Sequence, residues 1–456
     1  MDQQLLQKYN HPVPRYTSYP PANHFTAGCL KEEWERAIFN SNHGEPQHIS
    51  YYIHIPFCKH LCHYCGCNSY AMAKPETVAK YIDAVVAEID RVTPMLTPLR
   101  ALSQIHFGGG SPTAIPIAYL QRIIERLLAG RQTLEKPEIA IECHPGYLEA
   151  SDWEALASAG FNRVSIGIQD FNPEVVKAVN RRPSLLAPEA ILAILRSRNI
   201  SVNLDLMYGL PLQTENSFAE TIQRAIELRP HRLVTFPYAH VPWVNPSQKI
   251  LEKLGLPDAN QRVAMFATAT RLLLSAGYHQ VGLDHFVLPS DELWEAAQTR
   301  TLHRNFQGYC TRATTGQVYA FGVTAISQIH GAYLQNGKNI PKYIEESLSG
   351  SLLPDKSYLL NPREIAVQKV ITHLMCNYEV NWDLLSDGNN PESRGALQEA
   401  TGYNPQRFEA FERDGLITPT PYGFRITPKG IPFTRVVAAA LDPSYQTQTN
   451  AYSKPF

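Results

Sequence analysis

The stretch Tyr51-Tyr-Ile-His-Ile-Pro-Phe-Cys-Lys-His-Leu-Cys-His-Tyr-Cys-Gly-Cys67 joins a short β-rich run to four closely spaced cysteines. Cys58, Cys62 and Cys65 follow a C-x3-C-x2-C spacing, and Cys67 comes two residues later. Three thiolates on one short loop can bind three irons of a four-iron cluster, which leaves the fourth iron without a protein ligand. An open coordination position is typical of a catalytic metal. The loop therefore predicts an iron–sulfur cluster with chemistry at its open iron.

A structural zinc site is the alternative interpretation of this loop, because His60 and His63 are interleaved with the cysteines. Structural zinc sites usually take a second ligand pair from a separate segment, and we find no such pair in the sequence. A disulfide framework is not expected, since the remaining cysteines are scattered along a long chain. The spacing favours iron–sulfur and leaves zinc open.

The bulk composition excludes several classes of protein. The chain has 456 residues, of which 44% are hydrophobic and 18% charged, as in an ordinary globular protein. Its net charge of −1 provides no general attraction for nucleic acid or anionic membranes. The N-terminus has no secretory pattern, and no stretch approaches the ~20 apolar residues of a membrane span. We therefore expect a cytoplasmic protein that binds neither nucleic acid nor membrane.

Six β-rich runs alternate with helical patterns after residue 50, which predicts βαβ units and a parallel sheet. The predicted strands are 51–55, 104–107, 138–142, 163–169, 202–207 and 232–236, and the predicted helices are 78–89, 119–128, 151–160, 175–179, 188–197 and 218–228. This order fits a partial or full barrel, or a doubly wound sheet. In each architecture, functional groups gather at the carboxyl ends of the strands.

Polar residues lie where these predicted strands end. The cysteine loop follows the first strand, Gly108-Gly-Gly110 the second and Glu142 the third, while Gln169 ends the fourth and Asp205 lies late in the fifth. Each residue alone is equally well explained as a hydrogen-bonded core group. Their shared placement predicts that they meet around one mouth.

Two further units flank the predicted sheet. Residues 1–49 are rich in proline and aromatic residues and predict an extended arm. Predicted helices at 362–376 and 405–416 and a strand at 423–427 suggest a small winged-helix-like unit. Residues 303–309 fit no periodic pattern. We expect an arm over the active site at 1–49, a barrel with its extension at 50–350 and a C-terminal domain at 351–456.

The cysteine spacing with Tyr64, and the segment Gly109-Gly-Ser-Pro-Thr113, resemble the radical S-adenosylmethionine (radical SAM) superfamily. More narrowly, residues from about 9 to about 440 resemble the oxygen-independent coproporphyrinogen III oxidase family. The family-specific parts are Pro14-Arg-Tyr-Thr-Ser-Tyr-Pro20, Cys67 and the segments 167–172, 203–211, 238–240, 284–286 and 305–309. The resemblance implies an α/β fold: a partial (β/α)6 barrel with an N-terminal arm and a smaller, mostly helical C-terminal domain.

The resemblance also implies which residues form the site. Cys58, Cys62 and Cys65 would bind a [4Fe–4S] cluster. Two S-adenosylmethionine molecules per chain would be contacted by Tyr52, Tyr64, Cys67, Gly109, Gly110, Ser111, Glu142, Gln169, Arg181, Asp205, Ala239 and Ile326. Catalytic roles are expected for Tyr52, Glu142 and Cys67. Substrate contacts are expected from Arg15, Arg304, Phe306 and Gln307.

The implied reaction is the oxidative decarboxylation of two propionates of coproporphyrinogen III by a 5′-deoxyadenosyl radical, giving the vinyl groups of protoporphyrinogen IX. The implied enzyme of porphyrin biosynthesis is a monomer that takes electrons from a low-potential donor such as flavodoxin or ferredoxin. A related haem chaperone and a sister radical enzyme that modifies haem stay open as alternatives. Such chaperones lack the equivalent of Cys67 and the Pro14–Pro20 arm, and both are present here.

Overall fold

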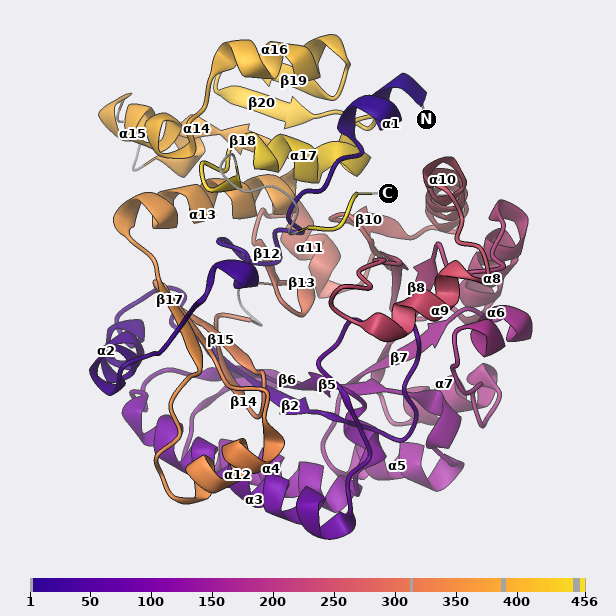
Figure 1. The fold of residues 1–456 in the computed structure, drawn as a ribbon, viewed down its shortest axis with the longest axis vertical. Coiled ribbons are helices and arrows are strands. Elements are labelled where there is room, and N and C mark those ends of the chain that lie inside the picture. The colour runs from indigo at the N-terminus through magenta and orange to yellow at the C-terminus, as the bar shows by residue number, and fades with distance from the viewer. Residues whose placement is uncertain (1–2, 312–314, 387–390, 446–451, 456) are drawn as a thin grey trace.

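The computed structural model describes residues 3–311, 315–386, 391–445 and 452–455. Its centre is a 13-stranded sheet with the strand order β1-β17-β16-β15-β14-β2-β5-β6-β7-β8-β9-β11-β10 (Figure 1). Six neighbouring strands run parallel in chain order: β2 (Ile49–Ile55), β5 (Leu102–Gly109), β6 (Thr133–Cys143), β7 (Arg163–Gln169), β8 (Ser201–Tyr208) and β9 (Arg232–Pro237). The predicted parallel sheet is confirmed.

Helices connect these strands and cover one face of the sheet (Figure 1). They are α3 (Pro75–Val92), α4 (Ile117–Leu128), α5 (Ala150–Ser158), α6 (Pro173–Ala178), α7 (Pro188–Ser197), α8 (Glu215–Leu228) and, after β9, α10 (Ala259–Ser275). The strand order has two separate edges, at β1 and at β10, so the βα units form a partial barrel. This is the expected fold class.

The alternation of side chains along the strands explains why one face of the sheet is polar. In β7, Val164, Ile166 and Ile168 are buried, while the residues between them are half-buried. β8 repeats this pattern with a period of two. Successive side chains of a strand point to opposite faces, so the apolar set packs under the helices and the polar set faces the barrel interior. The sequences RVSIGIQ and SVNLDLMY thereby place functional groups inside the barrel.

Further strands extend both edges of the parallel sheet. β14 (Gln317–Phe321) pairs with β2 in parallel, and antiparallel strands β15 (Ile326–Ile329), β16 (Ala332–Gln335), β17 (Lys356–Leu359) and β1 (Thr26–Ala27) follow. At the other edge, β11 (His285–Val287) and β10 (His279–Val281) extend β9. The C-terminal half of the chain also contains the helices α9 (Lys249–Glu252), α11 (Glu292–Gln298) and α12 (Ile340–Leu348).

Two segments show local structure that the periodic pattern did not predict. The segment 303–309 forms a hairpin of β12 (Leu302–Asn305) and β13 (Gly308–Thr311), whose short strands do not produce a readable periodicity. Helix α5 begins at Ala150, and the carboxylate of Asp152 accepts a hydrogen bond from the Glu149 backbone N–H at 2.9 Å. Asp152 therefore caps this helix, which begins one residue before the predicted start at 151.

The C-terminal unit has a hydrophobic core of its own, to which the N-terminal arm contributes. It contains α13 (Pro362–Asn377), α14 (Trp382–Leu385), α15 (Pro391–Thr401), α16 (Pro405–Arg413), α17 (Thr434–Ala439) and a small sheet of β18 (Glu379–Asn381), β20 (Gly423–Ile426) and β19 (Ile417–Thr420). Leu5, Leu6 and Tyr9 pack into the core of this unit. The arm is not wholly extended, because it includes α1 (Gln3–Tyr9) and α2 (Lys31–Ser41). The predicted domain limits stay a prediction.

Candidate active site

A cavity of about 650 Å³ opens at the carboxyl ends of the parallel strands. Its wall combines the cysteine loop, the hairpin β12–β13, the N-terminal arm and α17. The predicted site residues that line it are Arg15, Cys58, Cys62, Tyr64, Cys65, Cys67, Gly109, Gly110, Ser111, Glu142, Gln169, Arg181, Asp205, Ala239, Arg304, Phe306 and Gln307. Segments far apart in the sequence thus form one site.

The cysteine loop is held in place through its backbone. Its oxygens accept hydrogen bonds from side chains of one segment: Cys65 from Asn245 Nδ2 at 2.6 Å, and Tyr64 from Gln248 Nε2 at 3.0 Å. The His63 N–H donates to the Val179 oxygen at 3.0 Å. These bonds satisfy a loop that lacks regular secondary structure, so the sulfur atoms are held by the surrounding fold.

The glycine-rich end of β5 fits closely against this loop. The Gly110 N–H donates to the Ile55 oxygen at 2.9 Å. A Cβ at Gly110 would lie 2.9 Å from the Cys58 sulfur and 2.8 Å from the Pro56 oxygen, so only glycine is tolerated there. Gly109 has a φ of +114°, which also favours glycine. The close approach of backbone to sulfur leaves the open side of the loop for a metal cluster and its ligand.

The buried thiol of Cys58 in the cysteine loop suits the binding of a positively charged metal. Burial raises the pKa of the Cys58 thiol to about 12, so this ligand ionises only when a metal compensates the charge. Among the described residues, no three His, Cys, Asp or Glu side chains converge on a point that could hold one metal ion. The three cysteine ligands of a four-iron cluster bind different irons, so they need no common point.

Arg181 connects the cysteine loop to β7. Its Nη1 donates to the Tyr64 hydroxyl at 2.9 Å and contacts the Cys62 sulfur at 3.6 Å, and its Nη2 donates to the Gly167 oxygen. A Cβ at Gly167 would lie 2.9 Å from this guanidinium, which explains the glycine in the strand. A hydrogen bond to a ligating sulfur orients and stabilises the thiolate. The guanidinium would therefore support the thiolate of Cys62, whose role as a cluster ligand stays a prediction.

Three acceptor groups face the cavity beside the cysteine loop. Glu142 Oε1 lies 3.1 Å from His106 Nε2, and Asp205 accepts from the Ser165 hydroxyl at 2.8 Å. Burial raises the pKa of Asp205 to about 7. Gln169 has a φ of +70°, rare for a residue with a side chain, and its buried Oε1 has no partner in the chain. An unsatisfied buried acceptor and two carboxylates suit the ammonium and hydroxyl donors of a nucleotide-linked amino acid.

Tyr52 and Ile326 do not line the cavity. The Tyr52 ring stacks on His106 with centroids 5.9 Å apart, and its hydroxyl lies 3.3 Å from His54 Nδ1. Ile326 begins β15 and pairs with Gln335 in the antiparallel extension. Direct contact of these two residues with a cofactor stays a prediction.

The side of the cavity formed by the hairpin and the arm carries Arg304 and Arg15 near Asp284. Burial would raise the pKa of Asp284, but its hydrogen bond with His285 and the charges of the two arginines lower it. Arg304 is 8% exposed and lies over the Tyr309 ring at 4.4 Å, while its Nε and Nη1 have no hydrogen-bond partner. The Gln307 Nε2 is also buried without a partner. Arg15 lines the same cavity, and burial lowers its pKa. Buried donors without acceptors are unusual, so this wall fits an anionic ligand.

Sequence reasoning missed Arg435 and His144, which also line the cavity. Arg435, from α17, donates to the backbone oxygens of Val13 and Pro14 at 2.5 and 2.9 Å, and thereby positions the arm just before Arg15. His144 follows β6; its Nδ1 accepts from the Gly146 N–H at 3.0 Å, and its buried Nε2 has no partner. Neither residue belongs to a motif with a recognisable spacing.

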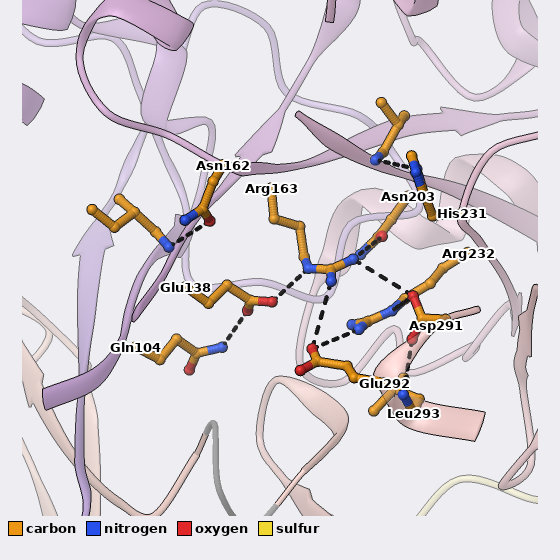
Figure 2. Close-up of polar contacts among 12 residues, drawn as sticks. Gln104, Glu138, Asn162, Arg163, Asn203, His231, Arg232, Asp291, Glu292 and Leu293 are labelled. Carbon is orange, nitrogen blue, oxygen red and sulfur yellow. Dashed lines mark hydrogen bonds and ion pairs between the residues drawn. The ribbon is translucent and has the colours of Figure 1, made fainter. Parts of the chain in front are cut away.

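The floor of the cavity is a network of buried ion pairs between strand starts and α11 (Figure 2). Arg163 pairs with Glu138 at 2.5 Å, and Arg232 pairs with Asp291 at 2.7 Å and Glu292 at 2.9 Å. Burial alone would raise the pKa of Glu138, but Arg163 and Arg232 lower it overall. Three carboxylates face two arginines, so the floor has no free positive charge for a ligand.

Residues 52–225 match the profile of the radical SAM superfamily. Fold and site thus define a radical SAM enzyme. The oxygen-independent coproporphyrinogen III oxidase of Synechocystis sp. is 34% identical over 98% of this chain and 96% of its own length, and that of Escherichia coli K12 is 36% identical over 97% and 95%. The chain belongs to the family of oxygen-independent coproporphyrinogen III oxidases.

A solved structure supports the same assignment over nearly the whole chain. Coproporphyrinogen III oxidase from Escherichia coli, described as a radical SAM enzyme, superposes with a TM-score of 0.86 at 32% identity. The superposition covers 97% of this chain and 99% of the Escherichia coli chain. Membership in the superfamily implies a [4Fe–4S] cluster and S-adenosylmethionine, which favours the iron–sulfur interpretation of the cysteine loop over zinc. None of the described helices has both the length and the apolar character to cross a membrane.

Proposed function

We propose that this chain converts coproporphyrinogen III into protoporphyrinogen IX by oxidative decarboxylation of two propionate side chains without oxygen. One observation carries this proposal: a single cavity is lined both by the cysteine loop and by the unpaired donors of Arg304 and Gln307. A radical generator and an anion-binding wall in one enclosed space are what the reaction requires. Its floor, neutralised by ion pairs, offers no competing anion site.

Cys58, Cys62 and Cys65 are the ligands we assign to the cluster, with Arg181 supporting them. When bound, the cluster and S-adenosylmethionine supply a carbon radical that removes hydrogen from the substrate. Gly109 and Gly110 let the end of β5 pack against His54 and the Cys58 sulfur, and we assign cofactor contacts to this wall of the site. We assign further contacts with S-adenosylmethionine to the cavity-lining residues Tyr64, Cys67, Ser111, Glu142, Gln169, Asp205 and Ala239. Tyr52 and Ile326, which do not line the cavity, have indirect roles.

Two further assignments concern how many cofactor molecules bind and which residues act on them. We assign two S-adenosylmethionine molecules per chain to the site beside the cysteine loop. Cys67 is exposed and lies beside Cys65, whose sulfur accepts from the Cys67 N–H at 3.4 Å. We assign catalytic roles to Cys67, Glu142 and Tyr52.

The substrate carboxylates are assigned to the hairpin and the arm. Arg304 and Gln307 present unpaired donors, Arg15 adds a cation and Phe306 an apolar surface. A guanidinium can bind a carboxylate through two parallel hydrogen bonds. The arm that carries Arg15 also covers the cavity, which excludes water from the reacting groups.

Anaerobic reconstitution with iron and sulfide tests the proposal. The protein is then incubated with dithionite, S-adenosylmethionine and coproporphyrinogen III, and the products are analysed by mass spectrometry. Protoporphyrinogen IX with 5′-deoxyadenosine is the expected result, and the Cys62→Ser variant should form neither. Haem binding without turnover would indicate the chaperone alternative instead. We further assign a cytoplasmic monomer that receives electrons from flavodoxin or ferredoxin.

A further inference from the structure

The outer side of the cysteine loop packs against two helices, α6 and α9, which come from distant parts of the chain. Cys62 and Tyr64 share a small hydrophobic core with Val175 of α6 and with Leu251 of α9. α6 and α9 lie near each other in the fold (Figure 1). Asn245 and Gln248 bind the loop backbone on the same side. The segment 241–254 therefore forms the outer cover of the loop that carries the cluster ligands.

This cover exposes large apolar side chains that the fold leaves without a partner. Trp243 is 62% exposed and Val244 is 65% exposed, and they directly precede Asn245, which binds the cysteine loop. Leu61, in the loop itself, is 43% exposed, as is Leu254. Exposed tryptophan next to other apolar side chains is typical of a protein interface. We call Leu61, Trp243, Val244, Ile250 and Leu254 the outer patch.

Positive charge surrounds the outer patch. The exposed charged residues of the cysteine loop, α6 with its C-terminal turn, and segment 241–254 are the cations Lys59, Lys177, Arg182, Lys249 and Lys253 and the acids Glu174 and Glu252. Glu252 is already paired with His240 at 2.8 Å. The chain as a whole has a net charge of −1, so this surplus of positive charge is local. It suits an acidic partner, because opposite charges steer association.

We infer that the outer patch and its basic rim are the docking surface for an acidic, low-potential one-electron carrier protein. The inference rests on the proposed function, which requires one electron from outside for each cofactor cleavage. The carrier loses that electron and the cluster gains it. The surface is the outer cover of the cysteine loop, so a carrier bound there places its redox group close to the cluster. Electron-transfer complexes typically bury small interfaces with an apolar centre and a charged rim.

Binding of reduced and oxidised flavodoxin to the reconstituted holoenzyme tests the inference. The dissociation constant is measured by isothermal titration calorimetry at several salt concentrations. Trp243→Ala should weaken binding about 10-fold, since exposed tryptophans often dominate interfaces. Lys249→Glu/Lys253→Glu should also weaken binding and flatten its salt dependence. Leu99→Ala and Lys136→Glu are matched controls, because both residues are exposed and belong to segments at the amino ends of the strands.

Turnover with two reductants separates this inference from the proposed function. With dithionite, a small reductant that needs no docking, both variants should turn over at the wild-type rate. With reduced flavodoxin, their rate at low carrier concentration should fall as binding weakens. Unchanged dissociation constants in both variants would overturn the inference. If the wild type makes no product even with dithionite, the proposed function is wrong, whereas the dissociation constants still decide the docking surface.

Discussion

Arg181 donates a hydrogen bond to the Tyr64 hydroxyl at 2.9 Å and joins the strand end of β7 to the cysteine loop. Replacing it with lysine keeps the charge but removes the planar fork that contacts Tyr64, Cys62 and Gly167 together. We expect Arg181→Lys to lower cluster content or turnover by about 10- to 100-fold, as loss of a group that supports metal ligands usually does. Iron and sulfide analysis and 5′-deoxyadenosine formation measure this effect. Arg182→Lys, at the exposed neighbouring position, should behave as the wild type.

Arg304 should set substrate affinity rather than cofactor cleavage. Its buried Nε and Nη1 lack partners in the chain, so a substrate carboxylate would be their acceptor. Arg304→Gln should raise the KM for coproporphyrinogen III about 10- to 100-fold, the loss expected for a hydrogen bond to a charged group. Steady-state kinetics check this, with Arg271→Gln on exposed α10 as the control. An unchanged KM would remove Arg304 from the substrate site.

Glu138 should be required for the stability of the barrel floor. Its side chain is 13% exposed and pairs with Arg163 at 2.5 Å (Figure 2). Glu138→Gln removes the carboxylate closest to Arg163 and leaves this arginine Glu292 at 3.5 Å and Asp291 at 3.9 Å, so the free energy of unfolding should fall by about 1–3 kcal/mol, the loss of one buried hydrogen bond to a charged group. Denaturant unfolding measures the change, and Glu135→Gln, exposed in the same strand, is the control. An unchanged free energy of unfolding in Glu138→Gln would mean that this pair does not stabilise the fold.

Glu88 should make stability depend on pH. Burial raises its pKa from 4.5 to about 7, despite hydrogen bonds from Asn336 and Tyr343. Between these values the folded protein keeps a proton that the unfolded chain releases, so stability falls as the pH rises from 4.5 to 7. The loss is about 3 kcal/mol from this group alone. Glu88→Gln should abolish this part of the pH dependence, measured by denaturant unfolding at pH 5 and 8. Parallel profiles for both proteins would contradict the prediction.

The parallel strands and the cysteine loop could be predicted because they depend on short-range patterns, whereas the order of the strands in the sheet came from the structure. A strand such as β7 shows its period-two alternation within seven residues, and the four cysteines lie in one loop. The hairpin at Arg304 and Phe306 could not be predicted in this way, because its strands are only four residues long. The floor network could not be predicted either, since Arg163 and Asp291 approach each other from positions more than a hundred residues apart.

The sequence by itself determined the close spacing of the cysteines, the polar inner face of β7 and β8 and the class of chemistry, because each is encoded in neighbouring residues. Only the tertiary structure decided that Arg181 contacts the cysteine loop, that Arg304 keeps two nitrogens without hydrogen bonds and that Arg435 positions the arm. It also decided that the segment of Trp243 and Asn245 binds the cysteine loop. Whether a charged group is paired depends on segments that packing brings together, and no local spacing records that.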